Sequence, residues 1–165
     1  MKDILDKNLD NWVEKIRLNL ETRLNVDYRT VHNEWISALR STYYFIGDEN
    51  DDKKDTERIK EYVNRMKKNK VILKAEVVSV EPSSIYSSAG YYIRAYVKFK
   101  ILSANDLSKQ SNIIFSRWGD AGVRIPNIRK NQWIEMYIDT NLGTQDAGST
   151  GEDYGIKEDF FRQRN

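Results

Sequence analysis

Residues 91–102 read YYIRAYVKFKIL, and apolar and polar side chains alternate along almost the whole stretch. A period of two residues places successive side chains on opposite faces of an extended strand. Such a strand needs a second layer over its apolar face, while the other face stays partly in water. One face carries Tyr91, Ile93, Ala95, Val97, Phe99 and Ile101, and the other carries Tyr92, Arg94, Tyr96, Lys98 and Lys100.

The chain before this strand has helical spacing, with apolar residues at every third or fourth position. Asp27 is a suitable N-cap for the second of three predicted helices, and Gly47 is a suitable end for it. We expect the acidic segment at residues 48–55 to be a solvated turn before a short third helix. The predicted helices cover residues 3–24, 28–46 and 56–68, so that helices occupy the region 3–68.

Strand patterns replace helical ones from residue 70 onward. The first strand alternates at Leu73, Ala75 and Val77 and then shifts phase to Val78 and Val80, as a β-bulge would cause. The predicted strands cover residues 71–80, 91–102, 112–118 and 132–140. In this phasing, the core-facing side chains are Leu73, Ala75, Val77, Ile93, Ala95, Val97, Phe99, Ile101, Ile134, Met136 and Ile138.

Residues 141–165 are rich in glycine and acidic side chains, and we expect an irregular tail there. Ile156, Phe160 and Phe161 would share one side of a terminal helical turn. Two hypotheses stay open for this tail: it covers the cationic sheet face or a neighbouring subunit, or it is a solvated terminus. The expected organisation is one domain over residues 1–140, with its sheet at 70–140, followed by the acidic tail.

Helices followed by a meander of strands predict an α+β fold, with N-terminal helices packed on a curved four-stranded antiparallel sheet. The order of elements over residues 27–140 resembles the cone-shaped NTF2-like or cystatin-like class. Within that class, it is similar to the periplasmic domains of VirB8-like conjugation proteins. The resemblance implies a scaffold subunit of a conjugation or secretion apparatus, and it rests on element order alone.

The composition excludes several classes of function. The net charge of +2 is too small to indicate a nucleic-acid or membrane partner by itself. The absence of cysteine excludes disulfides, thiol catalysis and cysteine-ligated metals. No apolar stretch has the length of a signal peptide or a membrane span. We expect a cytoplasmic protein as the sequence is written, and an extracytoplasmic one if a leader or anchor was removed.

Catalytic and metal-binding patterns are incomplete in the sequence. The acidic segment 48–52 matches the first ligand positions of an EF-hand, but Lys53 and Ile59 stand where that loop needs glycine and glutamate. His32 is the single histidine. Metal binding usually needs several ligands, and catalysis by histidine needs a nucleophile and an orienting partner, and the sequence shows no such set around His32. The core-facing set contains no group that transfers protons. We therefore predict a non-enzymatic protein without metal or cofactor.

The outward side chains give the candidate binding site. Their rings offer stacking surfaces, and their cations can pair with carboxylates or phosphates. A protein partner or a second copy of the chain is the expected ligand, and single-stranded nucleic acid is the alternative. A carrier of a small ligand in an apolar pocket between helices and sheet is a third class. The candidate residues are Tyr92, Arg94, Tyr96, Lys98, Lys100, Trp133 and Tyr137, with Arg117 as a further candidate.

Overall fold

The computed structural model describes residues 2–43, 49–87, 91–117, 119–121, 123–142 and 156–163. Within these residues, three helices precede the four long strands of an antiparallel sheet. The helices are α1 (Lys2–Leu24), α2 (Asn33–Thr42) and α3 (Glu49–Lys68). The strands are β1 (Val26–Asp27), β2 (Ile72–Val80), β3 (Tyr86–Ser87), β4 (Tyr91–Ser103), β5 (Trp133–Leu142) and β6 (Ile156–Gln163).

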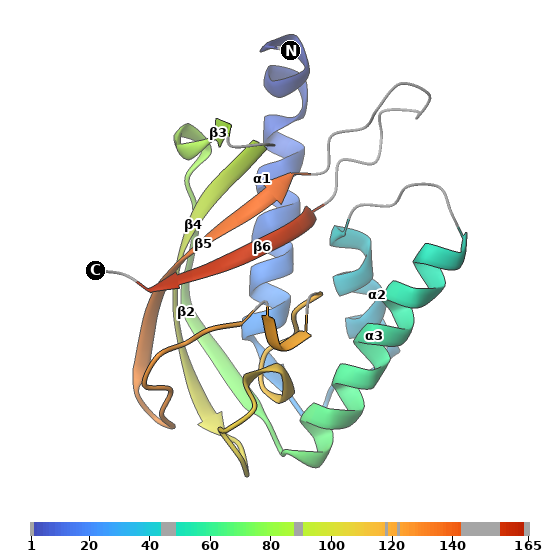
Figure 1. Cartoon of the computed structure of the whole chain (residues 1–165), viewed down its shortest axis with the longest axis vertical. Coiled ribbons are helices and arrows are strands. Elements are labelled where there is room, and N and C mark those ends of the chain that lie inside the picture. The colour runs from blue at the N-terminus through green and yellow to red at the C-terminus, as the bar shows by residue number, and fades with distance from the viewer. Residues whose placement is uncertain are drawn as a thin grey trace.

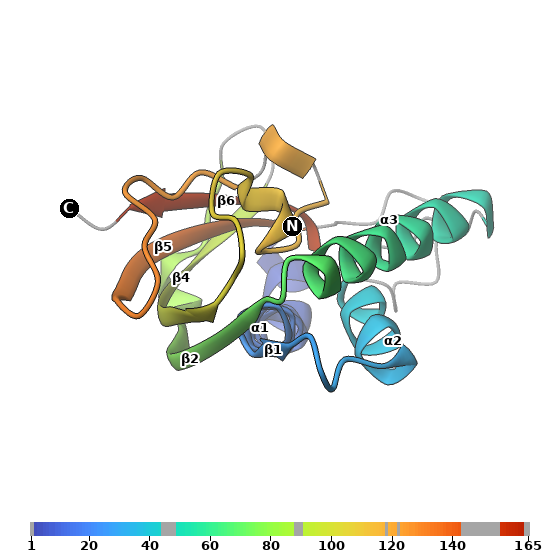
Figure 2. The same ribbon diagram turned by 90° about the horizontal axis from the view of Figure 1, so that it is seen from below.

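The strands form one open sheet in the order β1-β2-β4-β5-β6, and β3 pairs with β4. The sheet curves, and α1 runs along one of its faces while α2 and α3 lie farther from the strands (Figures 1 and 2). This arrangement confirms the predicted α+β class with helices N-terminal to the sheet. The likeness to the NTF2-like or cystatin-like cone stays a prediction.

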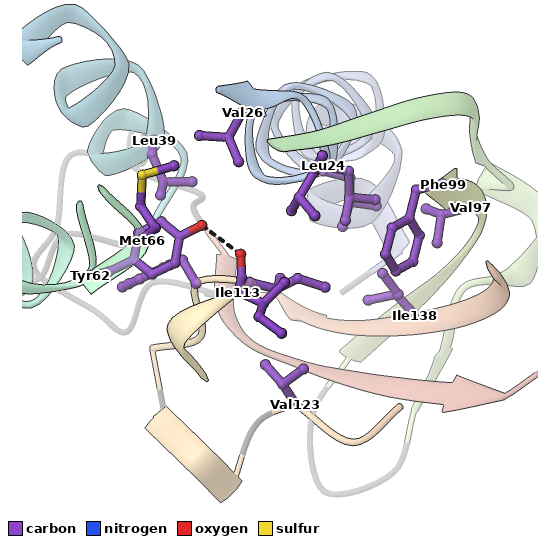
Figure 3. Close-up of a cluster of buried hydrophobic side chains, with 14 of the residues drawn as sticks. Leu24, Val26, Leu39, Tyr62, Met66, Val97, Phe99, Ile113, Val123 and Ile138 are labelled. Carbon is purple, nitrogen blue, oxygen red and sulfur yellow. Dashed lines mark hydrogen bonds between the residues drawn. The ribbon is translucent and has the colours of Figure 1, made fainter. Parts of the chain in front are cut away.

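The core forms between α1 and the inner face of the sheet, which is the face toward this helix. Four residues of α1 spaced by four positions are fully buried: Trp12, Ile16, Leu20 and Leu24. The inward positions of β4 meet them with no exposed surface, as the alternation predicts (Figure 3). Those buried positions of β4 are Ile93, Ala95, Val97, Phe99 and Ile101.

The predicted phase shift in the first strand is confirmed. The pairing of β2 with β4 is irregular between Ala75 and Val77, after which Val78 pairs with Val97 on the inner face. Val77 pairs with Lys98 instead, so it lies on the outer face. Its predicted place in the core is therefore wrong. The bulge begins one residue earlier than the sequence pattern indicates, because the extra residue is inserted before Val77.

The predicted strand at residues 112–118 is also wrong. The chain there forms a short 3₁₀ turn, η2 (Gln110–Asn112), and then a buried loop; Trp118 lies outside the described residues. Ile113, Ile114 and Phe115 are consecutive and all buried, which a loop enclosed by helices and sheet allows. A strand with one wet face would have exposed the middle residue of the three.

Polar side chains from the helices hold this loop. Arg23 of α1 is 1% exposed, and its Nε and Nη2 donate to the Phe115 carbonyl at 3.0 and 2.5 Å. The Tyr62 hydroxyl of α3 donates to the Ile113 carbonyl at 2.8 Å (Figure 3). Burial raises the pKa of Tyr62 well above its ordinary value, so the hydroxyl stays protonated and keeps donating. Loop carbonyls are thus satisfied by helix side chains in place of a neighbouring strand.

The helix boundaries differ from prediction at three places. α2 ends at Thr42 and not at residue 46, because Tyr43 is already extended. Residues 26–27 pair with β2 as β1, and the Asp27 carboxylate accepts the Arg29 N–H at 2.9 Å in a turn, so α2 begins only at Asn33. The acidic segment predicted as a turn is helical from Glu49 onward, and acidic residues suit the positive end of a helix dipole. Gly47 lies outside the described residues.

The terminal segment forms a strand where the sequence predicts an irregular tail with a helical turn. β6 pairs antiparallel with β5, from Met136 opposite Gln163 to Leu142 opposite Ile156. It therefore extends the edge of the sheet and does not lie across a face. Residues 143–155 lie outside the described residues, and the division into a domain and a tail stays a prediction for them.

Substitutions at two adjacent residues of β4 test the assignment of its faces. We expect Val97→Asp to abolish cooperative unfolding, because it buries a carboxylate without a partner at a cost of several kcal/mol, of order 3 or more. Lys98→Ser, one residue away on the outer face, should change stability by less than about 1 kcal/mol. Urea denaturation followed by circular dichroism measures both, and a Val97→Asp protein with a near-normal midpoint would contradict the assignment.

Candidate binding surface on the outer sheet face

The register of β4 and β5 brings the seven candidate residues onto one face of the sheet, called here the outer face. β4 residues Tyr92, Arg94, Tyr96, Lys98 and Lys100 share one phase, opposite to the buried phase. Cross-strand pairs place Arg94 opposite Asp139, Tyr96 opposite Tyr137, Lys98 opposite Glu135 and Lys100 opposite Trp133. The predicted grouping is therefore correct in geometry, and its role in binding stays a prediction.

Aromatic rings form two groups along this face. Tyr96 and Tyr137 lie with ring centroids 6.0 Å apart in a tilted arrangement in the middle of the face. Tyr86 of β3 stacks on Tyr92 at 5.2 Å. The sequence does not indicate the position of Tyr86 on this face, because its two-residue strand carries too little pattern to be recognised.

One end of the outer face is organised around a buried carboxylate, and we call it the Arg94 end. Asp139 has no exposed surface, although it lies on the outer phase of β5. It accepts hydrogen bonds from Arg94 Nε at 2.8 Å, from Arg94 Nη2 at 3.1 Å and from the Tyr86 hydroxyl at 2.8 Å. This carboxylate raises the pKa of Arg94, whose guanidinium also lies 5.6 Å from the centroid of Tyr137. Arg94 therefore stabilises the sheet by pairing with this buried carboxylate.

The opposite end, called the Trp133 end, is more exposed. Trp133 keeps 42% of its surface exposed, and the Nζ atoms of Lys100 and Lys98 lie 4.3 and 5.3 Å from its ring centroid. Lys98 also forms an ion pair with Glu76 of β2 at 3.2 Å. Lys74 of β2 lies opposite Lys100 in register, which continues this row of side chains across three strands.

Carboxylates offset the charge of the outer face. Glu76 and Asp139 pair with Lys98 and Arg94, and Glu135 accepts a hydrogen bond from the Tyr96 hydroxyl. The described side chains of β2, β4 and β5 on this face include four cations and three carboxylates. They are Lys74, Arg94, Lys98 and Lys100, against Glu76, Glu135 and Asp139. The alternation in the sequence is consistent with Glu76, Glu135 and Asp139 on this face, but it gives no sign of the pairs that they form.

Arg117 does not join the outer face. Its Nη2 donates to Asp55 of α3 at 2.8 Å, and its guanidinium lies 5.6 Å from the centroid of Tyr43. Asp55 is nearly buried and pairs with Arg58 as well, at 3.0 Å. Arg117 therefore joins the buried loop to α3. Its prediction as an outer-face residue followed from the incorrect strand at residues 112–118.

His32 shows no metal-binding arrangement in the part of the chain that the structure describes, and the side chains of the acidic segment 48–52 lie outside that part. His32 is exposed immediately before α2, and its carbonyl accepts the N–H groups of Trp35 and Ile36. No group of three His, Asp or Glu side chains is placed to hold a metal ion among the described residues. The described helices include none with the length and apolarity needed to span a bilayer.

Two surface clefts lie near the loops that follow β4. A cleft of about 480 Å³ is lined by polar loop residues that include Lys109, Asp120 and Arg124. A groove of about 180 Å³ lies beside Trp133, between the start of β5 and the loop before it. The first is lined by these loops alone and the second by a loop and β5, and neither is lined by α1. The predicted carrier pocket between helices and sheet therefore gains no support from them.

Comparisons with protein-family models, with curated proteins and with solved structures give no match for this chain.

Removing the buried carboxylate tests the structure of the Arg94 end. We expect Asp139→Ala to lower the free energy of unfolding by about 1–3 kcal/mol, because Arg94 and the Tyr86 hydroxyl lose their acceptor. The matched change Glu135→Ala, on the same strand and face but exposed, should cost only about 0.5 kcal/mol. Equal effects of the two changes in urea denaturation would contradict the distinction between a structural and a surface carboxylate.

Proposed function

We propose that this protein is a non-enzymatic interaction or assembly module whose outer sheet face binds a protein partner or a second copy of the chain. The observation that carries the proposal is a row of partly exposed aromatic side chains on the outer face. The cations beside these rings are matched by carboxylates on the same face. Tyr, Trp and Arg are enriched at the centres of protein interfaces, where rigid rings supply contact area at low entropic cost. Trp133 and the Tyr96–Tyr137 pair are of this kind.

The charge balance favours a protein over single-stranded nucleic acid. A strand-binding platform needs cations available to the phosphates, and its affinity comes largely from them. On this face Arg94 is bound to buried Asp139, and Lys98 is paired with Glu76. Glu135, exposed on this face between Trp133 and Tyr137, would repel a phosphate chain lying along the aromatic row. A protein surface can meet such mixed charges with its own complementary charges.

The finer assignment is a scaffold subunit of a conjugation or secretion apparatus. It is supported by the order of elements, with helices before a curved antiparallel sheet, which resembles the periplasmic domains of VirB8-like proteins. In such a subunit the outer face would join copies or neighbouring components of the assembly, and the protein would work outside the cytoplasm. In the absence of a removed leader or anchor, the proposed location is the cytoplasm.

A triple variant tests the proposal. Tyr96→Ser, Lys100→Ser and Trp133→Ser together should abolish self-association in sedimentation velocity, or abolish affinity capture of a partner from an extract of the source cells. Arg94 is left intact because Asp139 depends on it for its charge partner. Circular dichroism should show an unchanged fold, since the three side chains are partly exposed.

The matched control is the double change Lys60→Ser and Glu61→Ser, two exposed positions on α3 away from the sheet face. It should leave both association and capture unchanged. Association and capture that survive the triple variant would show that the outer face is not the interface.

A further inference from the structure

The outer face is electrostatically asymmetric. At the Arg94 end, the cation is matched by a fully buried carboxylate. At the Trp133 end, Lys74, Lys98 and Lys100 line up beside the exposed indole, and the backbone of Lys130 bridges to Ile101, the next residue along β4. The carboxylates described at this end are Glu76 and Glu135, so positive charge is in excess there.

A groove beside Trp133 lies next to these cations. Its lining combines apolar residues with one cation and one carboxylate. The apolar residues include Ile125, Pro126, Trp133 and Ile134, and the charged ones are Arg129 and Glu135. Its volume of about 180 Å³ is below the range of about 300–1,000 Å³ that is usual for small-molecule pockets. A volume of this size suits one anchoring side chain of a larger ligand.

The groove also follows the edge of a strand. Residues of both phases of β5, from Trp133 to Met136, contribute to its lining, so it lies along the edge of β5 that faces away from β4. The described pairing of β5 with β6 covers Met136 to Leu142. Three of the four β5 residues that line the groove, Trp133, Ile134 and Glu135, are outside this described pairing, and the fourth, Met136, is its last residue. An extended peptide segment is a suitable ligand for such a position, since strand edges recognise peptides through backbone and alternate side chains.

We propose that the Trp133 end binds an acidic, extended segment of a protein partner that places one apolar side chain in the groove. This inference rests on the proposed function and specifies the partner. The apolar side chain would contact Ile125, Pro126 and the indole of Trp133. Carboxylates before and after it would meet Lys100 on the sheet side and Arg129 on the loop side. Complementary charge sets the choice of partner, and burial in the groove sets the register.

Selection from a display library of random linear peptides against the whole chain tests the inference. We expect the selected sequences to share an excess of Asp and Glu around one large apolar residue. A synthetic peptide of the selected sequence, labelled with fluorescein, should bind in fluorescence anisotropy. Its affinity should fall when its apolar residue is changed to Ser or its carboxylates to amides. A selection that yields basic or uncharged sequences, or none, overturns the inference.

Variants of the protein locate the site of this peptide. Lys100→Ser, Arg129→Ser and Trp133→Ser should each weaken its binding by about tenfold or more, equivalent to about 1.4 kcal/mol. Arg129 is exposed and lies outside the sheet, so its variant keeps the test valid if Trp133→Ser perturbs the fold. The double change Lys60→Ser and Glu61→Ser, at exposed positions of α3 away from the outer face, is the control and should leave binding unchanged. Tyr92→Ser, on the same strand as Lys100 but at the Arg94 end, shows whether the peptide binds at that end instead.

The outcome separates this inference from the proposed function. Peptide binding lost in Tyr92→Ser and kept in the three Trp133-end variants overturns the inference, while the outer face remains the interface. If no peptide is selected and the triple variant at Tyr96, Lys100 and Trp133 also leaves association and capture unchanged, the proposed function fails as well.

Discussion

The two-residue period of β4 is the constraint on which the rest of the structure depends. β4 lies between β2 and β5, so both of its edges are hydrogen bonded and its side chains can point only to the two faces of the sheet. The inward side chains from Ile93 to Ile101 are fully buried, and covering them requires the apolar stripe of α1. A shift of one residue in the register would exchange the core and the outer face, which would bury Lys98 and expose Phe99.

The same constraint determines the chemistry of the outer face. The cations of β4 lie at alternate positions, so they share one face with the outward side chains of β2 and β5. Those neighbouring side chains include the carboxylates of Glu76, Glu135 and Asp139. The result is a face with aromatic side chains and balanced charge, except at the Trp133 end. A surface of this kind favours selective binding of a complementary protein surface over general attraction to phosphate.

Sequence reasoning was reliable where one periodicity extends over many residues. It predicted α1, β4, the bulge in β2 and the outer phase of Trp133 and Tyr137, because each rests on repeated spacing. It failed for Ile113–Phe115 and for β6. Three consecutive apolar residues fit a strand by propensity, but hydrogen bonds from Arg23 and Tyr62, distant in sequence, hold them as a loop. β6 has no clear alternation, and its conformation depends on pairing with β5.

The candidate site shows the same division. Its residues were found from the strand period alone, yet their ion pairs were not, because pairing depends on register and on distances between side chains of different strands. The burial of Asp139 had no signal in its own sequence neighbourhood. Its partners come from β3 and β4, more than forty residues earlier in the chain.

Fluorescence anisotropy of a labelled single-stranded oligonucleotide, titrated with the protein at low and at physiological salt, tests the central claim most directly. The claim is that ion pairs within the outer face leave it suited to a protein and not to phosphates. The account predicts no binding at physiological salt and at most weak binding at low salt, where screening is smallest. Micromolar binding at physiological salt that weakens steeply as salt is raised would contradict it.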